Sequence, residues 1–130
     1  MQPTFVSPAG LAPGAPYAYA AVAPAGSLVF TAGACPLDEH GSVVAPGDHE
    51  AQAGRALENL RTALDAAGSG FDKVVKTTVY VVGSRSELVR TWKIVEAAFG
   101  DAGPPSTLAG VTVLGYPEQL VEIEAVALAG

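Results

Sequence analysis

The chain has 130 residues, of which 49% are hydrophobic and only 15% are charged. A chain of this length can bury a hydrophobic core but rarely divides into two domains, so we expect a single domain over residues 1–130. Thirteen acidic residues against seven basic ones give a formal net charge of −6. This field repels the phosphate backbone of nucleic acids, so composition argues against a nucleic-acid partner.

The sequence shows no targeting, membrane or metal-binding pattern. Residues 1–10 lack a basic segment followed by an apolar run, and no run of about eighteen apolar residues occurs without polar interruption. One cysteine, Cys35, and two histidines, His40 and His49, do not have the spacing of metal ligands. We therefore expect a cytoplasmic protein without membrane contact, metal or cofactor.

The first third of the chain predicts strands and a loop. Two apolar stretches, residues 17–23 and 27–33, flank a Pro-Ala-Gly sequence at 24–26 that suits a turn, so they predict a β-hairpin. Residues 36–48 hold two prolines and two glycines and predict a loop with room for a short strand over 42–45.

The middle of the chain predicts two amphipathic helices around one strand. Residues 48–67 carry apolar side chains at three- and four-residue steps and end before Gly68, a typical C-cap. Residues 73–82 are rich in Val, Thr and Tyr and predict a strand. Alternation predicts that one face of this strand packs on a core and that the other does not; the core set is Val75, Thr77, Val79 and Val81, and the other set is Val74, Lys76, Thr78 and Tyr80. Ser84 and Glu87 predict a capping box for a second helix that ends at Gly100. The apolar stripe of that helix is Leu88, Trp92, Val95 and Phe99.

Two further strands, about 107–113 and 120–128, complete the order of elements. This order predicts an α+β fold in which two helices cover one face of a mixed sheet. The other face has no third helix to cover it, and another subunit is the simplest cover. We therefore expect a homo-oligomer.

Two carboxylates are the most suggestive polar side chains in the predicted strands. Alternation places Glu122 and Glu124 on the same face of the last strand. A carboxylate on a covered sheet face has to be paired, hydrogen-bonded or shifted in pKa, which suits general acid or base work. The alternative is structural: one glutamate pairs with a basic residue such as Lys76 and the other is solvated. Both interpretations stay open.

Five segments, in order and at matching separations, resemble the RidA (YjgF/YER057c/UK114) family. They are APY at 15–17, LVFTAG at 28–33, Gln52 with ALENL at 56–60, VVKTTVYV at 74–81 and LVEIEAVA at 120–127. The resemblance implies a chorismate-mutase-like homotrimer with three ligand clefts at the subunit interfaces. It also implies hydrolysis of reactive enamines and imines to carbonyl compounds and ammonia, without metal or cofactor.

Several site residues of the family have counterparts in this chain. The resemblance assigns the family's tyrosine to Tyr17 and its glutamate in the last strand to Glu122, and these are the predicted catalytic residues. The backbone that lines the site after the second strand corresponds to Gly33, Ala34 and Cys35. These three are predicted to bind substrate.

One position departs from the family. In the sequence PPST at 104–107, Ser106 stands where the family's Pro-Ala-Arg motif has the arginine that grips a substrate carboxylate, and Thr107 follows it. Trp92 falls at a position that is often asparagine. Ser106, Thr107 and Trp92 are also predicted to bind substrate. A serine hydroxyl cannot replace a bidentate guanidinium, so a substrate with the usual carboxylate is unexpected.

Two functions fit these residues. The first is a divergent imine or enamine hydrolase, or a related tautomerase, with Glu122 as acid or base, Tyr17 as hydrogen-bond donor and Ser106 as a neutral contact. The alternative is a catalytically silent trimer that binds a small molecule or a partner protein in the same clefts. A ribonuclease ranks third because the chain is acidic and shows no basic groove.

Overall fold

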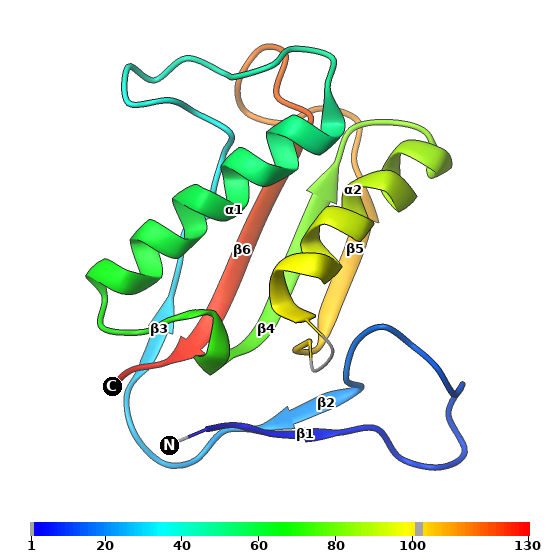
Figure 1. Cartoon of the computed structure of the whole chain (residues 1–130), viewed down its shortest axis with the longest axis vertical. Coiled ribbons are helices and arrows are strands. Elements are labelled where there is room, and N and C mark those ends of the chain that lie inside the picture. Colours follow the sequence, from blue (N-terminus) through cyan, green and yellow to red (C-terminus); the bar gives the residue numbers. More distant parts are fainter. Residues whose placement is uncertain (1, 101–102) are drawn as a thin grey trace.

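The chain forms a four-stranded mixed sheet with two helices on one face, and a separate two-stranded ribbon at one end (Figure 1). The structure is a computed structural model that describes residues 2–100 and 103–130. Strand order in the large sheet is β3-β6-β4-β5. The strands are β1 (Thr4–Val6), β2 (Ala20–Val22), β3 (Leu28–Phe30), β4 (Val74–Val81), β5 (Ser106–Gly110) and β6 (Val121–Leu128). β6 pairs antiparallel with β3 and β4, whereas β5 pairs parallel with β4 and forms an edge of the sheet.

The two helices begin where the sequence predicts. α1 (His49–Ala66) starts after Asp48, whose carboxylate accepts a hydrogen bond from the backbone N–H of Ala51 at 3.0 Å. α2 (Arg85–Phe99) starts after Ser84, which forms the predicted capping box with Glu87. Within the residues that the structure describes, neither helix is long and apolar enough to cross a membrane.

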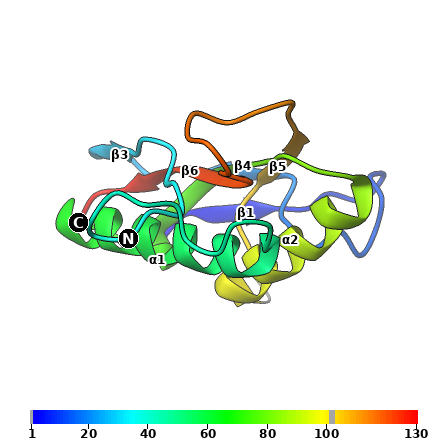
Figure 2. The same ribbon diagram turned by 90° about the horizontal axis from the view of Figure 1, so that it is seen from above.

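The hydrophobic core lies between the helices and the large sheet. Figure 2 shows both helices on one side of the sheet. Along β6, every second side chain is buried in this core, as the predicted alternation requires. These core residues are Val121, Ile123, Ala125 and Ala127. The stripe predicted for α2 is also confirmed: Val95 is buried, and its other members pack against the core.

The alternation predicted for β4 is correct except at its start. Thr77, Val79 and Val81 are buried as expected, but Val74 is buried as well, although it was predicted on the other face. A shift of register between Val74 and Lys76 explains the exception, because a bulge inserts one residue and changes the face of what precedes it.

The predicted hairpin of residues 17–23 and 27–33 is wrong. β2 pairs with β1, a strand that the sequence analysis missed, and β3 pairs with β6, at the other end of the chain. The physical reason is burial of apolar side chains: β3 pairs with the long strand β6, and this pairing places Val29 against the hydrophobic core. The turn at 24–26 therefore separates two sheets.

Two predicted strand limits also need correction. The short strand over 42–45 is absent from the described loop, which has only a single bridge between Leu37 and Val43, and Ala45 has a positive φ of 44°. The strand predicted over 107–113 ends at Gly110. Beyond it, the connection to β6 rises on the side of the sheet away from the helices (Figure 2).

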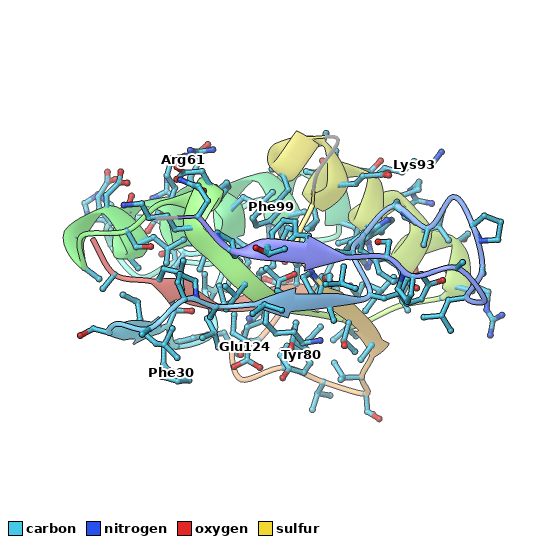
Figure 3. All side chains as sticks on the ribbon, turned by 90° about the horizontal axis from the view of Figure 1, so that it is seen from below. Phe30, Arg61, Tyr80, Lys93, Phe99 and Glu124 are labelled. Carbon is cyan, nitrogen blue, oxygen red and sulfur yellow. The ribbon has the colours of Figure 1, made fainter. Side chains whose placement is uncertain are left out.

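The second face of the large sheet is uncovered in the single chain. Phe30, Tyr80 and Glu124 point to the side opposite the helices (Figure 3). Phe30 is 72% exposed and Leu28 is 43% exposed, which is unusual for large apolar side chains on a sheet.

Candidate functional site

One group of four predicted site residues surrounds an open cavity of about 420 Å³, which we call the aromatic cavity. Its lining consists of Tyr17, Trp92, Ser106, Thr107 and Leu108. Tyr17 precedes β2, Trp92 comes from the middle of α2, and the other three residues lie along β5. The fold therefore brings together four residues that the sequence singled out, and adds Leu108.

Two aromatic rings form one wall of this cavity. The ring centroids of Tyr17 and Trp92 lie 6.3 Å apart with an interplanar angle of 83°, an edge-to-face arrangement. Tyr19 packs on the other side of Tyr17 at 5.7 Å. The backbone N–H of Ala18 donates to the carbonyl of Gly103 at 3.2 Å, which ties the Tyr17 segment to the chain that enters β5.

Ser106 occupies the polar side of the cavity. The hydroxyl of Thr77, which is 1% exposed, donates to the Ser106 oxygen at 2.6 Å. This contact leaves the Ser106 hydroxyl proton free to donate to a ligand. The side chain of Thr107 points to the opposite face of β5 from that of Ser106. The Lys76 ammonium donates to the Thr107 hydroxyl at 2.7 Å.

A second group of predicted residues gathers around Glu122, and we call it the Glu122 cluster. It consists of Gly33, Ala34, Cys35, Gln119 and Glu122. The side-chain amide of Gln119 and the thiol of Cys35 both donate to Oε1 of Glu122, at 3.1 and 3.3 Å. The backbone of Ala34 exchanges two hydrogen bonds with Ile123, at 2.7 and 3.1 Å, which holds this segment beside β6.

Gly33 is required for this arrangement. A Cβ atom at position 33 would lie 2.1 Å from Oε2 of Glu122, a distance that no alanine can adopt without displacing the carboxylate. The absence of a side chain thus lets the carboxylate lie directly against the backbone.

Cys35 serves as a hydrogen-bond donor in this cluster. Burial, together with its hydrogen bond to the Glu122 carboxylate, raises the pKa of Cys35 to about 11. The thiol is therefore protonated at neutral pH, which suits donation to Glu122 and not nucleophilic attack.

Glu124 has a different partner from Glu122. The hydroxyl of Tyr80 donates to the Glu124 carboxylate, and this hydrogen bond raises the pKa of Tyr80. The predicted ion pair with Lys76 is wrong: among the described residues no ion pair joins Lys76 to either glutamate, because the ammonium contacts Thr107.

The aromatic cavity and the Glu122 cluster do not meet within one chain. Ser106 is the register partner of buried Thr77, so its side chain faces the helix side of the sheet. Glu122 alternates with buried Val121 and Ile123, so its side chain faces the open side. The site that the resemblance treats as a unit is thus divided between two faces of the sheet.

The sequence analysis missed Gln119, which is 3% exposed and makes three hydrogen bonds with its side chain. It donates to Glu122 and to the carbonyl of Val121, and it accepts from the N–H of Tyr116 at 3.2 Å. Its position in a connection, three residues before Glu122, carries no periodic pattern that points to this role. The part of the chain that the structure describes contains no group of three or more His, Cys, Asp or Glu that could hold a metal ion.

Comparison with known proteins identifies the family. A family model described as Endoribonuclease L-PSP matches residues 9–129. The Drosophila melanogaster RutC family protein UK114 is 36% identical over 118 residues, which cover 91% of this chain and 83% of that protein. The chain belongs to the RidA (YjgF/YER057c/UK114) family. The resemblance read from its sequence motifs is therefore confirmed.

Two further RidA family members show what is shared. The crystal structure of YyfB, a Rid family protein from Yersinia pestis, matches with a TM-score of 0.90 and 29% identity, covering 98% of this chain and 99% of that chain. This likeness confirms the predicted α+β fold. The Mus musculus 2-iminobutanoate/2-iminopropanoate deaminase is 33% identical over 107 residues, which cover 78% of this chain and 74% of that protein. The RidA family thus includes enzymes named as imine deaminases.

Proposed function

We propose that this RidA family member hydrolyses reactive imines or enamines whose binding does not depend on a carboxylate. The observation that carries the proposal is the division of the site. The Glu122 cluster holds a carboxylate at the position that the resemblance assigns to the family's glutamate, whereas the aromatic cavity has Ser106 at the position that the resemblance assigns to the arginine.

The proposal includes a homotrimer that completes the site. The open sheet face bears exposed Phe30 and Leu28, which a neighbouring subunit would cover. Because the two halves of the site lie on opposite faces of one sheet, assembly is the simplest way to bring the Glu122 cluster of one subunit to the aromatic cavity of the next.

Glu122 has the geometry of a group that orients water. Both of its side-chain donors bind Oε1, so Oε2, beside Gly33, is left to accept a proton. Water adds to the C=N carbon while Glu122 takes one of its protons. That proton moves to nitrogen and gives a carbinolamine. Glu122 then transfers the hydroxyl proton of the carbinolamine to its amine while the C–N bond breaks, and the products are the carbonyl compound and ammonia. Tyr17 donates a hydrogen bond to the substrate in this scheme.

The cost of losing the arginine sets the substrate class. A hydrogen bond to a charged group contributes about 1.5–3 kcal/mol, which is roughly a ten- to hundredfold difference in binding. Ser106 cannot supply this binding free energy to a substrate carboxylate. The missing arginine does not weaken the binding of an uncharged imine, because that imine has no carboxylate.

The proposal is tested by following the loss of two freshly generated imines against a no-enzyme control. One is 2-iminobutanoate and the other is an imine of similar size without a carboxylate. We expect the wild type to prefer the uncharged imine and Glu122→Gln to lose about a hundredfold or more in turnover. We expect Ser106→Arg to gain activity on 2-iminobutanoate. Hydrolysis of neither imine by wild type and Ser106→Arg would refute the proposal.

A second candidate function is a silent trimer that binds a small molecule or a partner protein. The observation in its favour is that none of the described residues that line the aromatic cavity has a cationic side chain. Binding without turnover in the same assay, unchanged in Glu122→Gln, would select this function.

A further inference from the structure

The aromatic cavity has a composition that selects among uncharged ligands. The described residues of its lining are two aromatic rings, one leucine and two hydroxyl side chains, and among them the Tyr17 phenol is the only ionisable group. Its volume of about 420 Å³ lies within the range of about 300–1,000 Å³ that is common for small-molecule sites. The cavity therefore has room for a six-membered ring and a short polar substituent.

The hydroxyl groups of Ser106 and Thr107 in the cavity come from β5. Besides the free hydroxyl proton of Ser106, the edge strand β5 offers backbone groups. The carbonyl of Pro105 accepts from Thr77, and the N–H of Val111 donates to Val81, so alternate residues of β5 face β4. Ser106 and Leu108 therefore direct their backbone N–H and C=O groups toward the free edge, beside the cavity.

Charged side chains on the Ser106 side of the cavity disfavour an anion there. Glu96, four residues after Trp92 on α2, lines a small recess that adjoins the cavity through Trp92 and Ser106. The Lys76 ammonium donates to Thr107, whose side chain points to the opposite face of β5 from that of Ser106. A carboxylate at Ser106 would thus lie near the Glu96 carboxylate, and none of the described lining residues offers it a guanidinium.

We propose that the aromatic cavity binds flat, uncharged aromatic compounds that carry a carbonyl or imine group, with the ring against Trp92 and Tyr17 and the polar group on Ser106. This inference rests on the proposed function and names the substrate class of the same site. A ring contributes apolar area against both aromatic walls, and an acceptor oxygen or nitrogen satisfies the Ser106 hydroxyl.

The chain offers a direct readout, because Trp92 is its only tryptophan. Intrinsic fluorescence therefore reports the cavity itself, independently of any turnover. The probes are benzamide and benzoate, which share ring and shape but differ in charge. We expect benzamide to change the Trp92 emission saturably, with an affinity at least tenfold higher than that of benzoate.

Variants of Ser106 sharpen the test. Ser106→Ala is expected to weaken benzamide binding about two- to tenfold, the usual contribution of one neutral hydrogen bond. Ser106→Arg is expected to reverse the preference toward benzoate. Ser42→Ala, which removes the hydroxyl of an exposed loop serine, is the matched control and is expected to bind as the wild type does. Far-UV circular dichroism checks that each variant is folded.

Two outcomes would overturn the ligand class. One is no saturable change with either probe; the other is equal or tighter binding of benzoate. If benzoate binds as tightly as benzamide or more tightly, loss of benzoate binding in Lys76→Met would identify Lys76 as the cation that binds the benzoate carboxylate. Failure of the proposed function is distinct: benzamide binding without hydrolysis of any imine would leave the ligand class intact and remove the reaction.

Discussion

The aromatic cavity and the Glu122 cluster differ in the kind of chemistry that they can perform. The cavity has apolar walls with Ser106 as its directional donor, whereas the cluster holds a carboxylate fixed by Gln119 and Cys35. The first arrangement suits recognition and the second suits proton transfer. In the proposed function, recognition and chemistry are carried by opposite faces of one sheet, so substitutions in the two regions are expected to affect different kinetic constants.

The largest effect is expected from Gly33→Ala. A methyl group 2.1 Å from Oε2 forces the Glu122 carboxylate to move. A displacement of about 1 Å costs on the order of a hundredfold in rate, so we expect kcat to fall by that factor while benzamide binding to the cavity is kept. Steady-state kinetics on the uncharged imine and the Trp92 titration measure the two effects.

Gly54→Ala is the matched control for this substitution. Gly54 lies inside α1, and a Cβ atom there has nothing within 4 Å. Alanine favours the helix by roughly 0.5–1 kcal/mol relative to glycine. We therefore expect unchanged kinetics and a slightly higher melting temperature. An equal loss of kcat in both variants would remove the special role of Gly33.

A smaller effect is expected from Gln119→Leu. The variant removes one of the two donors to Oε1 of Glu122 and leaves the backbone N–H of Tyr116 without its acceptor. We expect kcat to fall about tenfold and the protein to lose about 1–3 kcal/mol of stability. KM and benzamide binding are expected to stay within twofold. A change confined to KM would contradict the assignment of Gln119 to the chemical half of the site.

The smallest expected effect is a change in the pKa of the Cys35 thiol, and its measurement needs no substrate. The pKa of Cys35 is raised from 9.0 to about 11, first by burial and then by Glu122. In Glu122→Gln the charge is removed, so we expect the pKa of Cys35 to fall while burial keeps it above its ordinary value. The pH dependence of iodoacetamide labelling at this single cysteine, followed by mass spectrometry, measures the shift. An unchanged profile would mean that the thiol does not contact Glu122.

The raised pKa of Cys35 also predicts a stability change at alkaline pH. Above pH 9 the unfolded chain loses the thiol proton while the folded chain keeps it until about pH 11. The folded state then binds more protons, so the free energy of unfolding falls as pH rises through this window. Cys35→Ser is expected to reduce the slope between pH 9 and pH 11 in urea titrations. The same slope in the wild type and in Cys35→Ser would contradict the raised pKa of Cys35.

Local patterns predicted the parts of the fold that depend on neighbouring residues. The capping box of Ser84 and Glu87 and the shared face of Glu122 and Glu124 follow from spacing alone, and both are present. The pairing of β1 with β2 and of β3 with β6 joins residues far apart in the chain, which turn residues at 24–26 do not encode.

The site residues were predicted from family motifs, and motifs do not reveal contacts that depend on the path of the folded chain. Tyr17, Trp92, Ser106 and Thr107 do surround one cavity, because three separate elements converge there. Gln119 was missed because its contact with Glu122 depends on the path of a connection and not on a repeat. The division between two faces was also missed, since the register of β4 and β5, which pairs Ser106 with buried Thr77, appears only in the folded chain.

The central claim is that the two regions complete one site across a subunit interface. Subunit mixing tests it most directly. Ser106→Trp fills the aromatic cavity and Glu122→Gln disables the chemistry, so each variant alone is expected to be inactive on the uncharged imine. When the two are unfolded together and refolded in equal amounts, random assembly gives about one site in four with both halves intact. Recovery of about a quarter of the wild-type activity is the predicted result. Mixed trimers that form but remain as inactive as the separate variants would contradict the account.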